Sequence, residues 1–520
     1  MGLAKILWAD DEMESLKSQV LFLENKGYEV HSLSNGFDAI EYVKKNEVDV
    51  VLLDESMPGI SGLETLQKIK EINALLPIVL ITKNETENLM NEAIGSQITD
   101  YLIKPVNPNQ VWLSLKKIID NKRLVAEKTT SSYQQHFRDL FMDLNNNPDF
   151  NGWMEIYKKL VYWELEMTKS DSPEMQEIFQ SQKQEANTEF FKFISKNYSS
   201  WASNPSAVGP VMSNTLMKFK VFPHLEKGIP TFFLLIDNLR FDQWKVLEPI
   251  FAENFRILEE DTFYSILPTA TQYSRNAIFA GLMPIEIEKQ FPTQWKNDDE
   301  EGGKNMYEEE FFKGQLNRLR KNDLKYSYTK VVHHNEAEKL VDNIHNYLQN
   351  DINIIVYNFV DMLSHARTEM EVLKELASDE VSYRSITASW FEHSFLHQAL
   401  KKIADKKINL IVATDHGSVR VNTPNKVVGD KQTTANLRYK HGRNLNYEPK
   451  DVLAFRDPKQ AGLPSPNVNS SFIFAKQDGY LCYPNNYNHF VNYYRNTFQH
   501  GGVSLEEVII PVIRMTSKNG

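Results

Sequence analysis

Short apolar runs of strand type occur in the first and last parts of this chain, and a long stretch of helical character separates them. In residues 1–120 such runs, for example KILWADD and VDVVLLD, alternate with amphipathic stretches such as MESLKSQVLFLENKG. From residue 221 the alternation returns, whereas residues 121–220 carry apolar residues at helical spacing. Strand–helix alternation is typical of parallel sheets covered by helices. The sequence therefore predicts an α/β protein: a doubly wound domain at 1–120, a helical bundle at 121–220 and a larger α/β domain at 221–520.

Composition limits the class of protein. The 520 residues suffice for about three domains of ~150 residues each. A net charge of −11 argues against a nucleic-acid-binding surface over the whole chain. Cys482 is the single cysteine, which excludes a disulfide framework and a cysteine zinc site and fits a reducing compartment. The N-terminal apolar run is too short for a secretion signal, and no stretch approaches the ~18 apolar residues of a membrane span. We therefore expect a cytoplasmic protein without membrane insertion.

Polar residues close four of the five strand-type runs of the first segment. They are Asp10, Asp11, Asp54, Thr82 and Lys104. The carboxyl ends of parallel strands meet at one edge of a doubly wound sheet. Three carboxylates placed together need a cation, and oxygen ligands suit Mg²⁺. Asp54 is therefore predicted to be a nucleophile that accepts a phosphoryl group, with Lys104 neutralising the phosphoryl oxygens.

On these residues the first segment resembles the receiver domain of two-component response regulators. The resemblance implies phosphorylation of Asp54 by a sensor histidine kinase. The implied magnesium ligands are Asp10, Asp11 and Asp54, and the implied switch residues are Thr82, Lys104 and Tyr101. Tyr101 is equally consistent with a tyrosine at a buried edge. The face of the fourth helix, fifth strand and fifth helix often pairs two receivers, so we expect a homodimer after phosphorylation. No basic recognition helix follows residue 120, so we look for the output elsewhere.

The middle segment is predicted to couple the two end domains. Its aromatic residues at helical spacing are expected to form the core of a small bundle. They are Trp153, Tyr157, Tyr162, Trp163 and Phe190.

Seven side chains of metal-ligand type lie in five separate islands of the last segment, four of them beside strand-type runs. They are Asp237, Thr271, Asp361, His365, Asp415, His416 and His500. Each island alone is more often structural, but together they can hold two cations. Two divalent cations about 3.5–4 Å apart suit hydrolysis of a phosphate ester. The mixed Asp and His set favours zinc and leaves manganese open.

Two further features of this segment bear on phosphate binding. Thr271 begins a helical stretch, and a helix N-terminus favours a phosphate oxyanion. Arg275 lies one turn later and is predicted to reach a phosphate. Residues 420–443 read as a basic loop, in which Lys426, Arg438 and Arg443 are predicted to contact a nucleotide backbone; a solvated loop explains the same charges.

With these motifs in order, residues 221–520 resemble the PglZ branch of the alkaline phosphatase superfamily. The resemblance implies one zinc ion held by Asp361, His365 and His500. It implies a second zinc ion held by Asp237, Asp415 and His416, with Thr271 bridging toward it as the nucleophile. A receiver joined through helices to a PglZ domain is similar to the PorX-type family of response regulators. That similarity implies phosphodiesterase action on oligonucleotides, including cyclic ones, and a link to type IX secretion.

Two other functions stay open from the sequence. The last domain can serve as a regulated scaffold that binds a sigma factor or a secretion-motor protein, as the PorX-type resemblance also implies. It can also act as a phosphomonoesterase on a small metabolite. A complete ligand set argues against a scaffold without catalysis, since a scaffold does not need all seven side chains.

Overall fold

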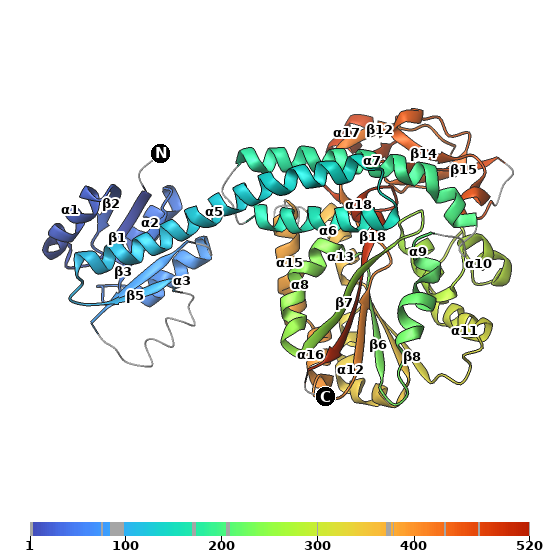
Figure 1. Ribbon diagram of the computed structural model, residues 1–520, viewed down its shortest axis with the longest axis horizontal. Coiled ribbons are helices and arrows are strands. Elements are labelled where there is room, and N and C mark those ends of the chain that lie inside the picture. Colours follow the sequence, from blue (N-terminus) through green and yellow to red (C-terminus); the bar gives the residue numbers. More distant parts are fainter. Residues whose placement is uncertain are drawn as a thin grey trace. The chain divides into compact units, whose positions relative to one another are not determined.

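The computed structural model describes residues 4–73, 76–83, 98–168, 173–203, 209–298, 300–370, 376–377, 379–430, 433–465 and 469–518. The chain divides into two compact units, Met1–Tyr133 and Gln134–Gly520. Figure 1 shows the elements of each unit.

The first unit is built on a parallel five-stranded sheet with the order β2-β1-β3-β4-β5. The strands are β1 Ala4–Ala9, β2 Tyr28–Leu33, β3 Val50–Asp54, β4 Ile78–Thr82 and β5 Asp100–Ile103. The described helices are α1 Lys17–Asn25, α2 Gly36–Lys45, α3 Gly62–Ile72 and α5 Pro108–Asn145. Strands β3 and β4 are buried along their whole length, because side chains on both faces of the sheet pack into separate apolar cores.

The middle segment is helical, as predicted. Helix α5 continues to Asn145 and is followed by α6 (Phe150–Met167) and α7 (Pro173–Ser203). Helix α6 begins where the Asp149 side chain accepts a hydrogen bond from the Gly152 N–H. Four of the five predicted core aromatics are buried, but Tyr162 is 55% exposed, so its placement in the core was wrong. Its neighbour Trp163 is only 6% exposed and takes the inward position on α6.

The second unit contains a six-stranded mixed sheet with the order β7-β18-β10-β6-β9-β8. Its strands are β6 Thr231–Ile236, β7 Phe255–Tyr264, β8 Tyr326–Val331, β9 Ile352–Tyr357, β10 Asn409–Ala413 and β18 Ile509–Ser517. Strands β10, β6, β9 and β8 are parallel neighbours, and β18 runs antiparallel to β10 and to β7. The carboxyl ends of the four parallel strands therefore meet at one edge.

Helices cover both faces of this sheet. They are α8 Phe241–Asn254, α9 Thr271–Ala280, α10 Pro284–Gln290, α11 Glu308–Arg318, α12 His334–Asn343, α13 Phe359–Glu369, α15 Glu380–His393 and α16 Phe395–Ile403. Helices α8 and α15 lie on one side of the sheet, and α9 and α11 on the other (Figure 1). The predicted fold class, a doubly wound receiver, a helical middle and an α/β last domain, is confirmed.

Small sheets surround the carboxyl edge. A three-stranded sheet holds β13 (Tyr439–Arg443), β15 (Ser470–Ala475) and β14 (Val452–Phe455). Two further sheets have two strands each. One pairs β11 (Val419–Arg420) with β17 (Phe498–Gln499), and the other pairs β12 (Thr423–Lys426) with β16 (Gly479–Cys482). The short helices α17 (Tyr487–Tyr494) and α18 (Leu505–Val508) complete this part. The prediction that 420–443 is a loop was wrong at its two ends, where β12 and β13 pair with distant strands. The described residues between β12 and β13 lie outside strands, apart from an isolated bridge at Val428.

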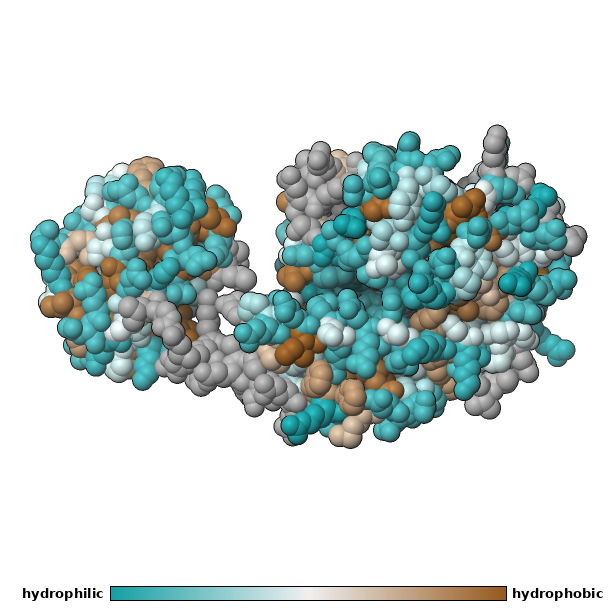
Figure 2. Space-filling model, turned by 90° about the horizontal axis from the view of Figure 1, so that it is seen from above, coloured by the Kyte–Doolittle hydropathy of each residue, from teal (hydrophilic) through white to brown (hydrophobic). Residues whose placement is uncertain are grey.

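Polar residues dominate the described part of the face of the second unit that is visible in Figure 2. Among the described helices, none has the length and apolar content needed to cross a bilayer.

Candidate metal centre and active site

Parallel strands bring three carboxylates to the carboxyl edge of the large sheet. Asp237 directly follows β6, Asp415 lies two residues beyond β10, and Asp361 lies in the first turn of α13, just after β9. Because β10 and β9 flank β6, these side chains converge. The ligand atoms of Asp237, Asp415 and His416 lie within 4.8 Å of one another, and so do those of Asp361, His416 and His500. His416 thus belongs to both groups.

Thr271 lies beside the shared histidine. Its Oγ1 is 3.0 Å from His416 Nε2 and 3.5 Å from Asp237 Oδ1. Thr271 is also the first residue of α9, so its hydroxyl lies at the positive end of a helix dipole. A phosphate oxygen near this hydroxyl would meet favourable charge.

Backbone carbonyls orient the two buried histidines. His416 Nδ1 lies 3.1 Å from the Gly417 carbonyl oxygen, and His500 Nδ1 lies 3.2 Å from that of Thr269. A carbonyl oxygen only accepts, so each Nδ1 carries a proton and each Nε2 faces the site. Burial, and then the proximity of His416, lower the pKa of His500 to about 3. His500 is therefore neutral near pH 7, as a metal-ligating imidazole must be.

The carboxylates carry more negative charge than the nearby side chains neutralise. Burial raises the pKa of Asp237 well above its usual range even though Arg275 opposes this. Burial also opposes ionisation of Asp361, but the hydrogen bond with His365 holds the pKa of that carboxyl below its usual value. Crowded acids beside neutral imidazole nitrogens form a donor set that fits divalent cations.

Two glycines permit the close approach of backbone segments around the histidines. A Cβ at Gly417 would overlap the backbone oxygen of Glu506. Gly501 has a φ of +119°, which side-chain-bearing residues rarely adopt. Its N–H donates to Thr269 Oγ1 over 3.0 Å, which ties the His500 turn to the loop before Thr271.

His365 lies beside the two groups rather than within them. Its Nε2 is 3.4 Å from Asp361 Oδ2, and its side chain is 61% exposed. Its ring centroid is 6.0 Å from that of His500. His416 also lies beside Asp361 and His500. The expected role of His365 as a ligand to the same ion stays a prediction.

Two arginines predicted to bind substrate are buried behind the site. Arg275 is fully buried and forms ion pairs with Asp237 and, through Nε at 2.9 Å, with Asp415. Arg438 is also fully buried and binds the Glu507 carboxylate through Nε at 3.0 Å and Nη2 at 2.6 Å. A substrate-binding role for these two residues was wrong, because their guanidinium groups already serve internal carboxylates.

The other two predicted substrate contacts remain near the surface. Lys426 is exposed on β12, and Arg443 is partly buried at the end of β13. Their contact with substrate stays a prediction.

Asn238 was not predicted from the sequence. It directly follows Asp237, and its backbone and side chain donate to Asp415 and Asp361. The sequence offered one indication of a role at the site: Asn238 lies next to Asp237, a candidate ligand. Residues at the end of a strand lie close to the same site as their neighbours.

The receiver unit brings its predicted acids together at the carboxyl edge of its own sheet. Ligand atoms of Asp10, Asp11 and Asp54 lie within 4.8 Å of one another. Lys104 Nζ is 2.9 Å from Asp10 Oδ2 and 3.0 Å from Asp54 Oδ1. Burial raises the pKa of Asp54 to about 6, with a contribution from Asp10 and against the effect of Lys104. This arrangement leaves a carboxylate ready for a cation or a phosphoryl group.

The predicted switch residues lie at the same edge or close to it. Thr82 is buried, and its backbone oxygen accepts a hydrogen bond of 2.8 Å from the Lys104 N–H. Tyr101 is 39% exposed on β5. The fourth helix of the predicted pairing face would fall at 84–97, outside the described residues.

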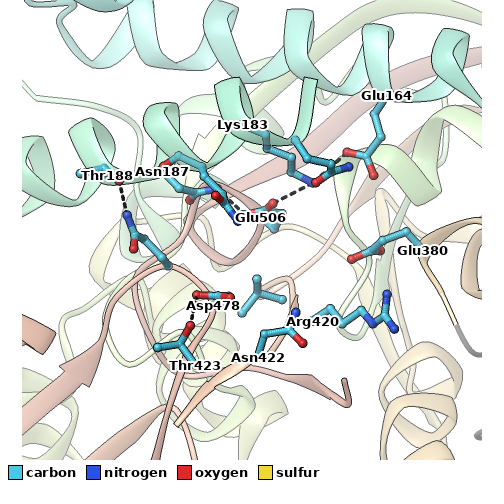
Figure 3. A pocket seen from close by; sticks show the side chains of 14 residues that line it. Glu164, Lys183, Asn187, Thr188, Glu380, Arg420, Asn422, Thr423, Asp478 and Glu506 are labelled. Carbon is cyan, nitrogen blue, oxygen red and sulfur yellow. Dashed lines mark hydrogen bonds and ion pairs between the residues drawn. The ribbon is translucent and has the colours of Figure 1, made fainter. Parts of the chain in front are cut away.

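A polar pocket of about 440 Å³ lies between the linker helices and the segments around β11, β12 and α18 (Figure 3). Lys183 and Asn187 reach from α7 toward Glu506. Lys183 Nζ lies 2.8 Å from Glu164 Oε2 and 3.0 Å from Glu506 Oε1. Asn187 Oδ1 accepts the Leu505 N–H over 2.8 Å. Helix α7 is therefore bound to the segment that follows His500.

The acids near this pocket are neutralised by protein cations, unlike those of the metal centre. Glu164, Asp242 and Glu380 also lie close together. Protein cations pair with each of them: Lys183 and Arg384 with Glu164, Arg384 and Arg240 with Asp242, and Arg240 with Glu380. This cluster is therefore an internal ion network and needs no metal.

Comparisons with known families agree with the three parts of the chain. A family model described as the BREX system PglZ alkaline phosphatase-like domain matches residues 216–515. One described as the PorX response regulator linker domain matches residues 123–202, and the response regulator receiver domain matches residues 6–116.

Individual relatives match parts of the chain. The transcriptional regulatory protein SrrA of Staphylococcus aureus is 28% identical over 170 residues, which cover 30% of this chain and 69% of that protein. A receiver domain protein from Clostridium thermocellum is 31% identical, with 24% of this chain and 98% of that chain covered and a TM-score of 0.23. Chemotaxis protein CheY4 of Vibrio cholerae is 26% identical, with 22% and 99% covered and a TM-score of 0.22.

Proposed function

Because the chain belongs to the PglZ family of alkaline-phosphatase-like domains, preceded by a PorX-type linker and a response-regulator receiver, we propose that it is a response regulator whose output is zinc-dependent hydrolysis of phosphodiesters. The order of the three parts agrees with the predicted PorX-type fusion. The observation that carries the proposed reaction is the convergence of three carboxylates and two imidazole rings beside the hydroxyl of Thr271.

Thr271 is the proposed nucleophile. Its Oγ would attack phosphorus, the bond from phosphorus to the leaving oxygen would break, and a phosphothreonine would form. Water would then cleave the phosphothreonine and restore the hydroxyl. The α9 N-terminus would orient a non-bridging phosphate oxygen. Two bound cations would supply charge neutralisation and a lower pKa for the attacking hydroxyl.

The residues that would hold the cations follow from the two groups. One cation would be held by Asp237, Asp415 and His416. The other would be held by Asp361, His416 and His500, with His365 adjacent to this second group. The proposed substrates are linear or cyclic oligonucleotides, as the family resemblance implies. Association with a sigma factor or a type IX secretion motor stays a prediction from that resemblance.

Metal removal tests the proposed function directly. We expect the full-length protein to hydrolyse a dinucleotide diester faster than a nitrophenyl monoester, to lose this activity after chelation and to regain it with Zn²⁺. The loss should reach at least about 10³-fold, because the cations provide most of the charge stabilisation at the reacting phosphate. Diester hydrolysis that persists in protein shown by elemental analysis to be metal-free would refute the proposal. Faster cleavage of the monoester would assign a phosphomonoesterase instead.

The receiver is the proposed switch, phosphorylated at Asp54 by a histidine kinase with Mg²⁺ held by Asp10, Asp11 and Asp54. Within the second unit, helix α7 would transmit the effect of phosphorylation to the catalytic site. Tyr198 Oη accepts the Leu267 N–H over 2.7 Å in the loop before Thr271, and Lys183 binds Glu506 beyond His500. Movement of α7 would therefore act on both sides of the catalytic site.

The raised pKa of Asp54 predicts a pH dependence for the receiver. With a pKa of about 6, Asp54 is mostly ionised at neutral pH and becomes protonated as the pH falls through 6. A cation must displace that proton, so the apparent Mg²⁺ affinity should be roughly tenfold weaker at about pH 5 than at about pH 7.5. Calorimetric titration at both pH values measures this. The Asp54→Asn variant, which lacks the titrating carboxylate, should show a smaller difference.

A further inference from the structure

Asn238 contacts carboxylates of both metal groups. It is fully buried and adopts the left-handed conformation with a φ of +61°. In this conformation its backbone N–H donates to Asp415 Oδ1 over 3.3 Å. Its side-chain Nδ2 donates to Asp361 Oδ1, also over 3.3 Å. One residue thus connects a carboxylate of the first group with a carboxylate of the second.

The chemistry of the partners determines which way the amide faces. An ionised carboxylate only accepts hydrogen bonds, so the NH₂ group of Asn238 must point toward Asp361. The carbonyl oxygen then faces away from Asp361. Among the described residues Asn238 Oδ1 has no hydrogen-bond partner, although it is buried. A buried acceptor of this kind costs about 1–3 kcal/mol unless a donor or a cation meets it.

The orientation of the Asp361 carboxylate depends on the NH₂ group of Asn238. Its Oδ1 lies 3.6 Å from His500 Nε2, and its Oδ2 lies 3.4 Å from His365 Nε2. The 3.6 Å separation from His500 Nε2 is too long for a hydrogen bond, so this histidine does not orient Asp361 Oδ1. The amide of Asn238 is therefore a donor that holds Asp361 Oδ1 toward the centre without adding charge.

We infer that Asn238 is a positioning residue that sets the spacing of Asp361 and Asp415 for a pair of divalent cations. This inference rests on the proposed metal-dependent function. The side-chain amide holds Asp361, and the backbone N–H holds Asp415. A residue with this role contributes mainly to cation affinity, because it contacts the ligands rather than the reacting atoms.

The left-handed backbone offers a clean way to separate the side chain from the conformation. Asparagine and glycine both adopt positive φ readily. Asn238→Gly therefore keeps the turn and its N–H bond to Asp415 while it removes only the amide. Asn444 has a similar φ of +51° and is exposed, so Asn444→Gly is a matched control for the same change.

The test measures Zn²⁺ binding by full-length protein in competition with a chromophoric chelator. We expect two tightly bound ions in the original protein and in Asn444→Gly. In Asn238→Gly at least one ion should bind about 10–100-fold more weakly, the range typical for loss of a group that orients metal ligands. Unchanged binding of both ions in Asn238→Gly would overturn the inference. Failure of the original protein to bind any ion would instead refute the proposed function.

A folding check accompanies the titration. Far-UV circular dichroism should be the same for all three proteins, since glycine fits the conformation at both positions. If Asn238→Gly loses this signal, Asn238→Ser replaces it, because a serine hydroxyl is too short to span from the turn after β6 to Asp361. Original-like Zn²⁺ affinity in a folded Asn238→Ser protein would likewise overturn the inference.

Discussion

Replacing Thr271 by alanine should lower diester hydrolysis by at least about 10³-fold, since loss of a nucleophile costs ~10⁴–10⁶ in well-studied hydrolases. The hydroxyl lies 3.0 Å from His416 Nε2 and 3.5 Å from Asp237 Oδ1, at the first residue of α9. Alanine removes the attacking oxygen but keeps a good helix former. The rate of dinucleotide cleavage by metal-loaded protein is the measurement.

Two further variants make the Thr271 result specific. Thr271→Ser retains a hydroxyl and should keep part of the activity. Thr293→Ala makes the same chemical change at an exposed threonine of the same unit and should leave the rate unaltered. Equal rates for Thr271→Ala and the original protein would remove Thr271 from the mechanism. A phosphorylated Thr271 peptide after rapid quenching of the original protein would support the covalent step.

Replacing Lys183 by methionine should destabilise the second unit by about 3–5 kcal/mol, because two carboxylates lose a shared cation in a buried place. Lys183 Nζ lies 2.8 Å from Glu164 Oε2 and 3.0 Å from Glu506 Oε1, and both carboxylate side chains are about 8% exposed. Burial disfavours the charged amine, but the attraction of Glu164 and Glu506 outweighs this and raises the pKa of Lys183. Methionine keeps the length of the side chain and removes only the charge.

The control for Lys183 lies on the same helix. Lys192 pairs with Glu189 at the surface over 2.6 Å, and its side chain is 65% exposed. Lys192→Met should change the unfolding free energy by only about 0–1 kcal/mol, as is usual for exposed pairs. Denaturant unfolding followed by tryptophan fluorescence measures both, since α6 and α7 carry Trp153, Trp163 and Trp201. Equal effects of the two substitutions would contradict the view that the pocket network stabilises the linker contact.

The Lys183 network also has a predictable response to acid. Burial opposes ionisation of Glu164, but Lys183 and Arg384 outweigh it and lower the pKa of that carboxyl. A lowered carboxyl pKa contributes stability that is fully present above the unfolded value of about 4.5 and is lost as the pH falls below it. The difference between Lys183→Met and the original protein should therefore shrink in acid.

Much of the fold and of the candidate site follows from local sequence patterns. Asp237 and Asp415 could be placed at one edge because each follows a continuous apolar run, and parallel strands share a carboxyl edge. The pair Asp361 and His365 could be placed on one face of a helix from its spacing alone. The order of receiver, helical segment and α/β domain follows from where strand-type runs stop and return.

Other features could not be read from local patterns. Arg275 has the spacing of a substrate contact, one turn after Thr271, but α9 packs so that its guanidinium group lies fully buried behind Asp237 and Asp415. The strands within 420–443 arise from pairing with residues 470–475 and 479–482, which lie far along the chain. Long-range pairing of this kind leaves little trace in short windows.

The sequence by itself determined which acids and histidines form the candidate site, which strands carry them and that the site can bind metal ions. These features depend on residue type and on the spacing of apolar residues along the chain. Only the tertiary structure decided that His416 is shared between two groups, that Arg275 faces inward and that Asn238 connects Asp361 with Asp415. Those outcomes depend on distances between segments that lie far apart along the chain, and such distances are set by the packing of the whole unit.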